Sequence, residues 1–328
     1  MDTGDKPRYD STERVIAMAP RIGYLLPTRE NTMAGQPEAV PLLQLAERAA
    51  GLGFDSIWVG DSLLARPRHD PLTLLAAVAA RVPRVDLGTA VLLPALRNSV
   101  VLAQQVATLD QISEGRVILG VGIASDFPNI RSEFVAAGVP FEKRVGRLLE
   151  GMQLCRALWT GKPVSWDGRW KVDGVLGPTP HRPGGPPWWI AGALPASLER
   201  AGRHFDGWIP NGPDAKRWGQ QWKEVQTVAR NAGRDPGKLT GAMYLTAAVD
   251  DDTSRADAKL AAYLEQYYGQ PAAQMRARQQ CYGGPVAGFA EWLRGYAEAG
   301  ASHLVLRFAG DHERHLETLP AIRAKLGW

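Results

Sequence analysis

Residues 85–125 decide the fold: VDLGTAVLLPALRNSVVLAQQVATLDQISEGRVILGVGIAS. An apolar, β-branched run at 85–93 is followed by a segment at 100–112 whose apolar residues recur at helical spacing, and then by a second apolar run at 116–121. Short apolar runs predict buried strands, whereas the longer period predicts an amphipathic helix. Strand, helix and strand in this order are typical of a βαβ unit, in which the two strands are parallel.

The same alternation continues on both sides of this unit, from residue 21 to the end of the chain. The predicted strands are 21–26, 56–60, 85–93, 116–121, 188–192, 207–210, 240–249 and 303–308. The predicted helices are 40–51, 71–80, 100–112, 143–159, 195–203, 215–232, 253–268, 285–299 and 312–326. Eight such strands favour an α/β fold of the TIM (β/α)8 barrel type. A doubly wound sheet is the alternative, but no GxGxxG motif opens the first helix.

Two segments depart from the alternation. Residues 1–20 mix acidic and basic residues with proline and predict an N-terminal tail, so that 21–328 is expected to be a single barrel domain. Residues 160–187 predict an insertion, because a hairpin turn at Asp167-Gly168 is followed by a segment too rich in proline and glycine for a helix or strand. Four tryptophans in or beside the insertion can wall an apolar pocket: Trp166, Trp170, Trp188 and Trp189. Core packing is the alternative for Trp189, whose predicted strand is buried.

The composition is that of a folded globular protein, with 45% hydrophobic and 22% charged residues in a chain of 328. The net charge is only +4 and no basic block is present, so a nucleic-acid partner is not expected. No apolar stretch reaches the roughly 20 residues that a membrane-spanning helix needs, and no signal peptide is indicated. Two cysteines without disulfide or zinc spacing, Cys155 and Cys281, favour a cytoplasmic location.

The six histidines predict neither a catalytic triad nor a metal site, because they are scattered and none directly follows a predicted strand. His312 and His315 have the i, i+3 spacing of residues that share one helix face, but they lie in a segment rich in Asp, Glu and Arg. A solvated helix face is therefore the favoured interpretation of this pair.

A TIM barrel carries its active site at the C-terminal ends of the strands, so the residues there are the candidates. They are Asp61, Ser62, Ala90, Val91, Gly122, Ile123, Ala124, Ser125, Gly192, Ala193 and Leu194. Asp61 can contact a polar ring edge or cap the next turn, and Gly122 can admit a flat ligand or form a tight turn. The backbone N–H groups at 192–194 can bind a phosphate or simply begin a helix.

The loop after the second strand carries Arg66, Arg68 and His69. These side chains can face a polar or anionic substrate, but solvated loop charges are the favoured interpretation.

Several segments together resemble the bacterial luciferase-like flavin-dependent oxidoreductases. They are GFDSIWVGDS (53–62), residues 86–125, residues 138–170, PPWWIAGALPASLERAGRHFDGWIP (186–210) and YGGPVAGFAEWLRGYAEAGASHLVLRF (282–308). The resemblance implies a TIM barrel with an insertion, which binds FMN or the deazaflavin coenzyme F-420 at the strand C-termini. It also implies a homodimer or homotetramer and a small-molecule substrate.

Carried over by position, Asp61 and Ser62 match an Asp-His pair beside the reactive ring, which implies catalytic roles although Ser replaces the His. Ala90 and Val91 match a non-proline cis peptide against the ring. Residues 122–125 match the loop below the ring, and 192–194 match a backbone phosphate site that here lacks its usual hydroxyl group.

The segment GVGIAS (120–125) resembles the glycine-rich form common in deazaflavin-using members, which favours that coenzyme over FMN. The deazaflavin passes only hydride, whereas reduced FMN also reacts with oxygen, so the coenzyme decides whether the substrate is reduced or oxygenated. A non-catalytic flavin-binding protein of the same fold is the alternative, because the His and the hydroxyl are missing. A barrel that acts on a phosphorylated metabolite without flavin is a third interpretation.

Overall fold

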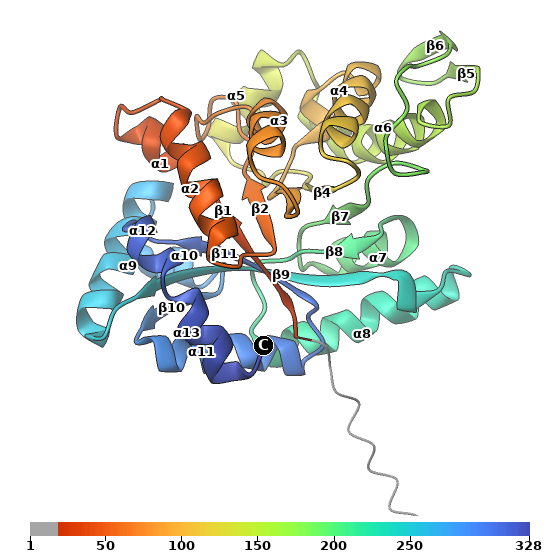
Figure 1. The fold of residues 1–328 in the computed structure, drawn as a ribbon. Helices are drawn as coiled ribbons and strands as arrows, with labels where there is room; N and C mark the ends of the chain where they lie inside the picture. Colours follow the sequence, from red (N-terminus) through yellow and green to blue (C-terminus); the bar gives the residue numbers. More distant parts are fainter. Residues whose placement is uncertain (1–18) are drawn as a thin grey trace, which may run out of the picture.

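The computed structural model describes residues 19–328. These residues form a closed barrel of parallel strands (Figure 1). The eight barrel strands are β1 (Arg21–Leu25), β2 (Ser56–Val59), β3 (Asp86–Thr89), β4 (Val117–Val121), β7 (Trp188–Ile190), β8 (Gly207–Trp208), β9 (Thr240–Val249) and β11 (His303–Phe308). They pair in this order, and the ring closes because β11 also pairs with β1. The predicted TIM barrel is therefore confirmed, while most of the predicted tail lies outside the described residues.

The helices surround the strands, and Figure 1 shows α3 and α4 on one side of the barrel and α8 and α11 on the opposite side. The long helices are α2 (Val40–Gly51), α3 (Pro71–Arg81), α4 (Ser99–Ile112), α6 (Arg144–Leu158), α7 (Pro195–His204), α8 (Ala215–Asn231), α9 (Thr253–Tyr268) and α11 (Val286–Glu298). Polar caps set where several of them begin; for example, the Asp214 carboxylate accepts a hydrogen bond from Arg217 N at the start of α8. Every one of these helices was predicted to within two residues.

Shorter elements were not predicted from the sequence. They are α1 (Thr28–Met33), α5 (Pro128–Ala136), α10 (Ala272–Arg276) and β10 (Cys281–Gly284), which adds to the C-terminal half of β9 outside the barrel. The final predicted helix is two helices, α12 (His312–Leu316) and α13 (Leu319–Leu326). The third strand ends at Thr89 and not at residue 93, because the chain leaves the regular ladder there.

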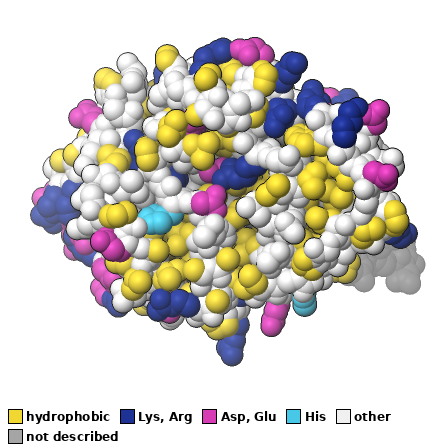
Figure 2. All heavy atoms as spheres, turned by 90° about the horizontal axis from the view of Figure 1, so that it is seen from above, with side chains coloured by type: hydrophobic (Ala, Val, Ile, Leu, Met, Phe, Trp, Pro, Cys, Tyr) yellow, Lys and Arg dark blue, Asp and Glu magenta, His cyan; other side chains and the backbone are white. Residues whose placement is uncertain are grey.

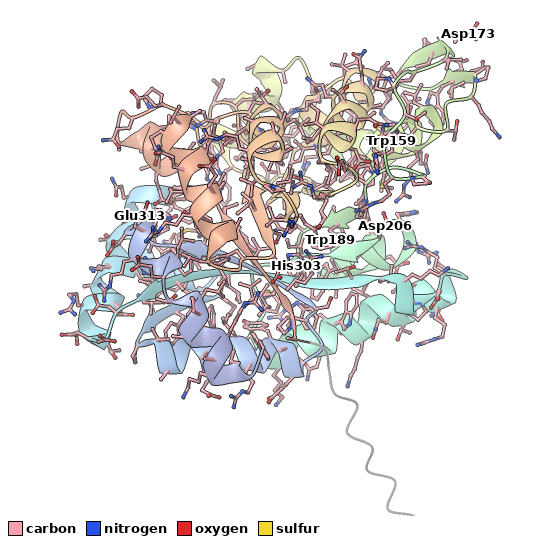
Figure 3. The ribbon with its side chains drawn as sticks, viewed as in Figure 1. Trp159, Asp173, Trp189, Asp206, His303 and Glu313 are labelled. Carbon is pink, nitrogen blue, oxygen red and sulfur yellow. The ribbon has the colours of Figure 1, made fainter. Side chains whose placement is uncertain are left out.

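The predicted insertion contains the expected hairpin, formed by β5 (Val164–Asp167) and β6 (Lys171–Gly174). Figure 3 shows Asp173 of this hairpin at the periphery of the molecule, whereas Trp189 and His303 lie near the barrel centre. Trp170 and Trp188 are buried in the main hydrophobic core. These two side chains pack in the core and do not wall an open pocket. Trp189 is buried in a second apolar cluster, so core packing is the correct interpretation of that residue.

Trp58 lies in the barrel interior, where it is fully buried, contacts two glycines and packs in a cluster that includes Trp189. A Cβ atom on Gly88 would lie 2.2 Å from the Trp58 ring, and one on Gly23 would lie 2.3 Å from Trp58 Nε1. Trp58 Nε1 donates to Ser56 Oγ (2.7 Å), which also bonds His303 Nε2 (2.8 Å). Burial lowers the pKa of His303 to about 3, so this imidazole is neutral.

The surface of the described chain bears charges of both signs. In the view of Figure 2, Lys and Arg side chains lie in separate groups among acidic and apolar ones. Within residues 19–328, no helix is both long and apolar enough to cross a membrane. The same residues contain no cluster of three or more His, Cys, Asp or Glu side chains suited to a metal ion.

Candidate active site

The peptide bond between Ala90 and Val91 is cis, as the resemblance implied. It lies at the C-terminal end of β3, where the chain turns from one neighbouring strand to the other: Ala90 N donates to Val59 O (2.8 Å), and Leu92 N donates to Gly120 O (2.8 Å). The peptide between these two bonds is left outside the ladder of the barrel. This backbone therefore forms a shelf at the barrel mouth, and we define the shelf as residues 90–91 together with 122–125.

Glycines on β4 make the shelf possible. A Cβ atom on Gly120 would lie 2.1 Å from Thr89 O, and one on Gly122 would lie 2.8 Å from Val91 Cγ2. The first contact is with rigid backbone and the second is with the end of a side chain. Ile123 and Ala124 continue the shelf with half-buried side chains, and Ser125 is exposed.

The segment 192–194 has the geometry of a backbone anion site. Gly192 has a φ of +103°, which favours glycine, and its carbonyl accepts a hydrogen bond from Trp208 Nε1 (2.7 Å). The Ala193 carbonyl accepts from Gln221 Nε2 (2.9 Å). Among the described residues, no acceptor is found for the N–H groups of Ala193 and Leu194, and α7 begins directly after them. Free N–H groups at a helix start are suited to a phosphate.

Asp61 is tied to the chain that follows the cis peptide. Its carboxylate accepts a hydrogen bond from Leu93 N (2.9 Å) and pairs with both terminal nitrogens of Arg97, which also reaches Asp70. The Asp61 side chain is only 2% exposed. This carboxylate therefore does not cap the next turn, and its contacts hold the shelf in place; contact with a coenzyme ring stays a prediction.

Ser62 is also buried, and its hydroxyl donates to Glu133 Oε1 and accepts from Arg66 N (2.9 Å). The same Glu133 oxygen accepts from Leu64 N and Ala65 N, so this carboxylate organises the whole loop after β2. A catalytic role for Ser62 remains a prediction. Sequence reasoning missed Glu133 because it lies on α5, a short helix that the periodicity did not indicate.

His312 and His315 contradict the predicted solvated face. His315 is 1% exposed and its Nε2 accepts a hydrogen bond from Val249 N (2.9 Å). His312 joins Tyr24 OH (2.9 Å) and Glu30 Oε2 (2.8 Å). The prediction failed because the acidic and basic residues of 312–326 divide between two short helices, and the histidines face inward. A nearby cavity of about 200 Å³ is lined by Glu30, Met33, Ala34, Tyr263, Gln266, Tyr267 and Gly310.

Arg307 was not singled out from the sequence, although a charged residue in the apolar strand HLVLRF is a usable signal. Its side chain is 2% exposed at the C-terminal part of β11. The guanidinium donates to Thr246 Oγ1 (2.8 Å), Tyr268 OH (2.8 Å) and Gln279 Oε1 (2.6 Å), all of them neutral groups. The solvated-charge interpretation is wrong for Arg68, which is half-buried and donates to Tyr267 OH (3.0 Å).

The chain is similar to known proteins in sequence and in fold. The family model described as luciferase-like monooxygenase matches residues 18–327. An F420-dependent glucose-6-phosphate dehydrogenase of Nocardia farcinica is 31% identical over 85% of this chain and 90% of its own length. A 5,10-methylenetetrahydromethanopterin reductase of Methanolobus tindarius is 30% identical over 66% of this chain and 64% of its own length.

Solved structures have the same fold. An F420-dependent secondary alcohol dehydrogenase in complex with an F420-acetone adduct superposes with a TM-score of 0.77, at 21% identity over 94% of this chain and 99% of that one. A monooxygenase from Streptomyces bottropensis superposes with a TM-score of 0.78, at 25% identity over 93% and 98% of the two chains. By sequence and by fold, the chain belongs to the luciferase-like monooxygenase family.

Proposed function

We propose that the protein is an oxidoreductase that transfers hydride between a deazaflavin coenzyme of the F-420 type and a small organic substrate. The observation that carries this proposal is the backbone shelf at the barrel mouth, where residues 90–91 leave the strand ladder and the close approach of β4 requires Gly120 and Gly122. A flat ring system can approach the backbone closely at such a shelf, because Gly120 and Gly122 carry no side chains.

The residues present fit such a coenzyme. The coenzyme ring would lie on the shelf, and the phosphate of the coenzyme would bind the free N–H groups of Ala193 and Leu194, which follow the adjoining strand β7. When bound, the deazaflavin supplies a carbon centre that accepts or donates hydride. The protein supplies the position of that ring and a largely apolar floor.

Asp61 and Ser62 act on this site through their partners. Asp61 and Arg97 hold the chain after the cis peptide, and Ser62 and Glu133 fix the loop after β2. Both pairs keep the shelf in one conformation, so that a bound ring meets a preorganised surface. Direct proton transfer by either residue remains a prediction.

Support for the deazaflavin over FMN comes from the resemblance of GVGIAS (120–125) to deazaflavin-using members and from the names of the relatives. Hydride transfer without oxygen is the expected reaction; FMN would instead make oxygenation the expected one. A small-molecule substrate, two or four copies per assembly and a cytoplasmic location remain predictions.

Titration of the purified protein with each coenzyme, followed by the quenching of tryptophan fluorescence, tests the proposal. We expect saturable binding of the deazaflavin and at least tenfold weaker binding of FMN. Oxidation of the bound reduced deazaflavin by a panel of carbonyl compounds without oxygen would then distinguish an enzyme from a binding protein. Binding of neither coenzyme would reject the proposed function.

A further inference from the structure

We propose that the barrel mouth contains an anion-binding subsite, formed by Arg29, Arg66, Arg68 and Arg307 around Tyr267 and Tyr268, that takes a carboxylate or phosphate group of the organic substrate. We name it the arginine subsite. The inference rests on the proposed function, because it assigns the substrate class to the same barrel mouth.

Four guanidinium groups gather on two adjacent tyrosine rings, whose centroids are 4.9 Å apart. Measured from the guanidinium carbon to the Tyr267 centroid, Arg29 lies at 4.9 Å, Arg68 at 5.8 Å and Arg307 at 4.8 Å. Arg66 lies 4.8 Å from the Tyr268 centroid. These side chains come from α1, the loop after β2 and the end of β11, so only the tertiary fold brings them together.

The cluster lacks acidic partners. Within residues 19–328, none of these four arginines has a carboxylate oxygen within 4.0 Å. Glu30 lies on the same side of the barrel, but its two oxygens already bind Tyr263 OH (3.0 Å) and His312 Nε2 (2.8 Å). Burial lowers the pKa of Arg29, and the neighbouring charges of Arg68 and Arg66 act in the same direction.

Partly buried cations without counter-charges are unfavourable, because each loses hydration and all repel one another. An anionic ligand would supply the missing charge. Guanidinium groups bind carboxylate and phosphate oxygens through paired N–H donors, which suits either group. The cluster is therefore best explained as a site that a ligand completes.

The subsite reaches the shelf but lies away from the proposed coenzyme phosphate site. A Cβ atom on Gly60 would lie 2.2 Å from Arg68 Nη1 and 3.4 Å from Ala90 O, so Arg68 stands beside the cis peptide. The residues of the arginine subsite lie on β11 or on segments that follow β1, β2 and β9. The segment 192–194 follows β7, on the opposite side of the barrel. An anion held by Arg68 would place the rest of a substrate next to the shelf.

The test is calorimetric titration with inorganic phosphate and, separately, with acetate at constant ionic strength, using protein saturated with the coenzyme that binds. We expect saturable binding of at least one anion, and the preferred one distinguishes a phosphate from a carboxylate substrate. Arg68→Gln should weaken this binding at least tenfold. Arg230→Gln, on the exposed face of α8, is the matched control and should leave it unchanged.

Three results would overturn the inference. The first is no saturable binding of either anion, and the second is equal binding by wild type and Arg68→Gln. The third is a tyrosinate absorbance band at neutral pH that Tyr267→Phe removes, since Tyr267 would then be the counter-charge; Arg68 and Arg307 outweigh burial and lower its pKa. Failure of coenzyme binding is measured separately, so it rejects the proposed function without being confused with these results.

Discussion

The two sides of the barrel mouth are built by different means. On β3, β4 and β7, the surface is made by backbone: a cis peptide, glycines whose Cβ atoms would clash, and free N–H groups. On β9, β11, β1 and β2, it is made by arginine and tyrosine side chains. The backbone side is suited to a ligand part that is shared by many reactions, while the side-chain side can change its specificity by substitution. The comparison predicts different responses to mutation.

The largest effect is expected where the backbone side depends on one buried ion pair. Asp61→Asn and Arg97→Gln should each lower the free energy of unfolding by about 3 kcal/mol. Arg97→Gln leaves the buried Asp61 carboxylate without its counter-charge, and Asp61→Asn leaves Arg97 with only the more exposed Asp70. If Asp61 acts only by holding Arg97 in position, the double variant should lose little more free energy of unfolding than either single variant. Urea unfolding measures all three, and additive losses would show that Asp61 has a separate role.

Gly120→Ala should cost about 2 kcal/mol or more in the free energy of unfolding, because its methyl group would meet Thr89 O at 2.1 Å. Gly51→Ala is the matched control, since open space surrounds that glycine at the end of α2, and it should be close to neutral. Urea unfolding of the two variants tests the claim. A Gly120→Ala protein as stable as wild type would mean that the shelf does not need glycine.

A smaller effect is expected on the pH dependence of stability, through His303 in the barrel interior beneath both sides of the mouth. Burial holds the folded-state pKa of His303 near 3, below the ordinary value of 6.5, so the unfolded chain binds the proton first as the pH falls. Stability is therefore full above about pH 6.5 and declines toward pH 3, by about 2 kcal/mol at pH 5 from this group alone. Urea unfolding at several pH values checks this: between pH 7 and pH 5, His303→Gln should lose about 2 kcal/mol less free energy of unfolding than wild type. Parallel pH profiles would contradict the neutral, buried imidazole.

The smallest effect on stability is expected on the side-chain side. Arg68→Gln removes the hydrogen bonds to Tyr267 OH and Arg66 O and also one of four like charges, so the losses and the gain offset each other. We expect the free energy of unfolding to change by less than about 1 kcal/mol. Thermal unfolding checks this, with Arg230→Gln as the control; a loss as large as that of Asp61→Asn would show that Arg68 is a structural residue.

Much of the barrel could be predicted from the sequence, because each long helix buries one regular face and barrel strands such as β2, β4 and β11 are short apolar runs that are buried throughout. The segments 253–268 and 303–308 were predicted with the bounds that the structure shows. Helix α5 was missed because its stability comes from packing, as in the contact of Phe134 with Phe141, and not from its own period.

The site was only partly predictable, because it too depends on contacts between segments that are far apart in the sequence. The cis peptide followed from the family resemblance, and no spacing rule indicates it. The bond from Arg307 to Tyr268 joins residues 39 apart in sequence, and the bond from Arg68 to Tyr267 joins residues 199 apart. Such contacts exist only after the barrel closes, so the sequence alone left Arg68 as a loop charge and Arg307 unnoticed.

The division of the mouth into a coenzyme side and a substrate side is tested most directly by deazaflavin titration of three proteins: wild type, Gly122→Ala and Arg68→Gln. The Gly122 methyl group would meet Val91 Cγ2 at 2.8 Å, so the Val91 side chain on the shelf would have to move. We predict that Gly122→Ala weakens deazaflavin binding at least tenfold, while Arg68→Gln leaves it within twofold of wild type. The opposite pattern, with binding lost in Arg68→Gln and kept in Gly122→Ala, would contradict the account.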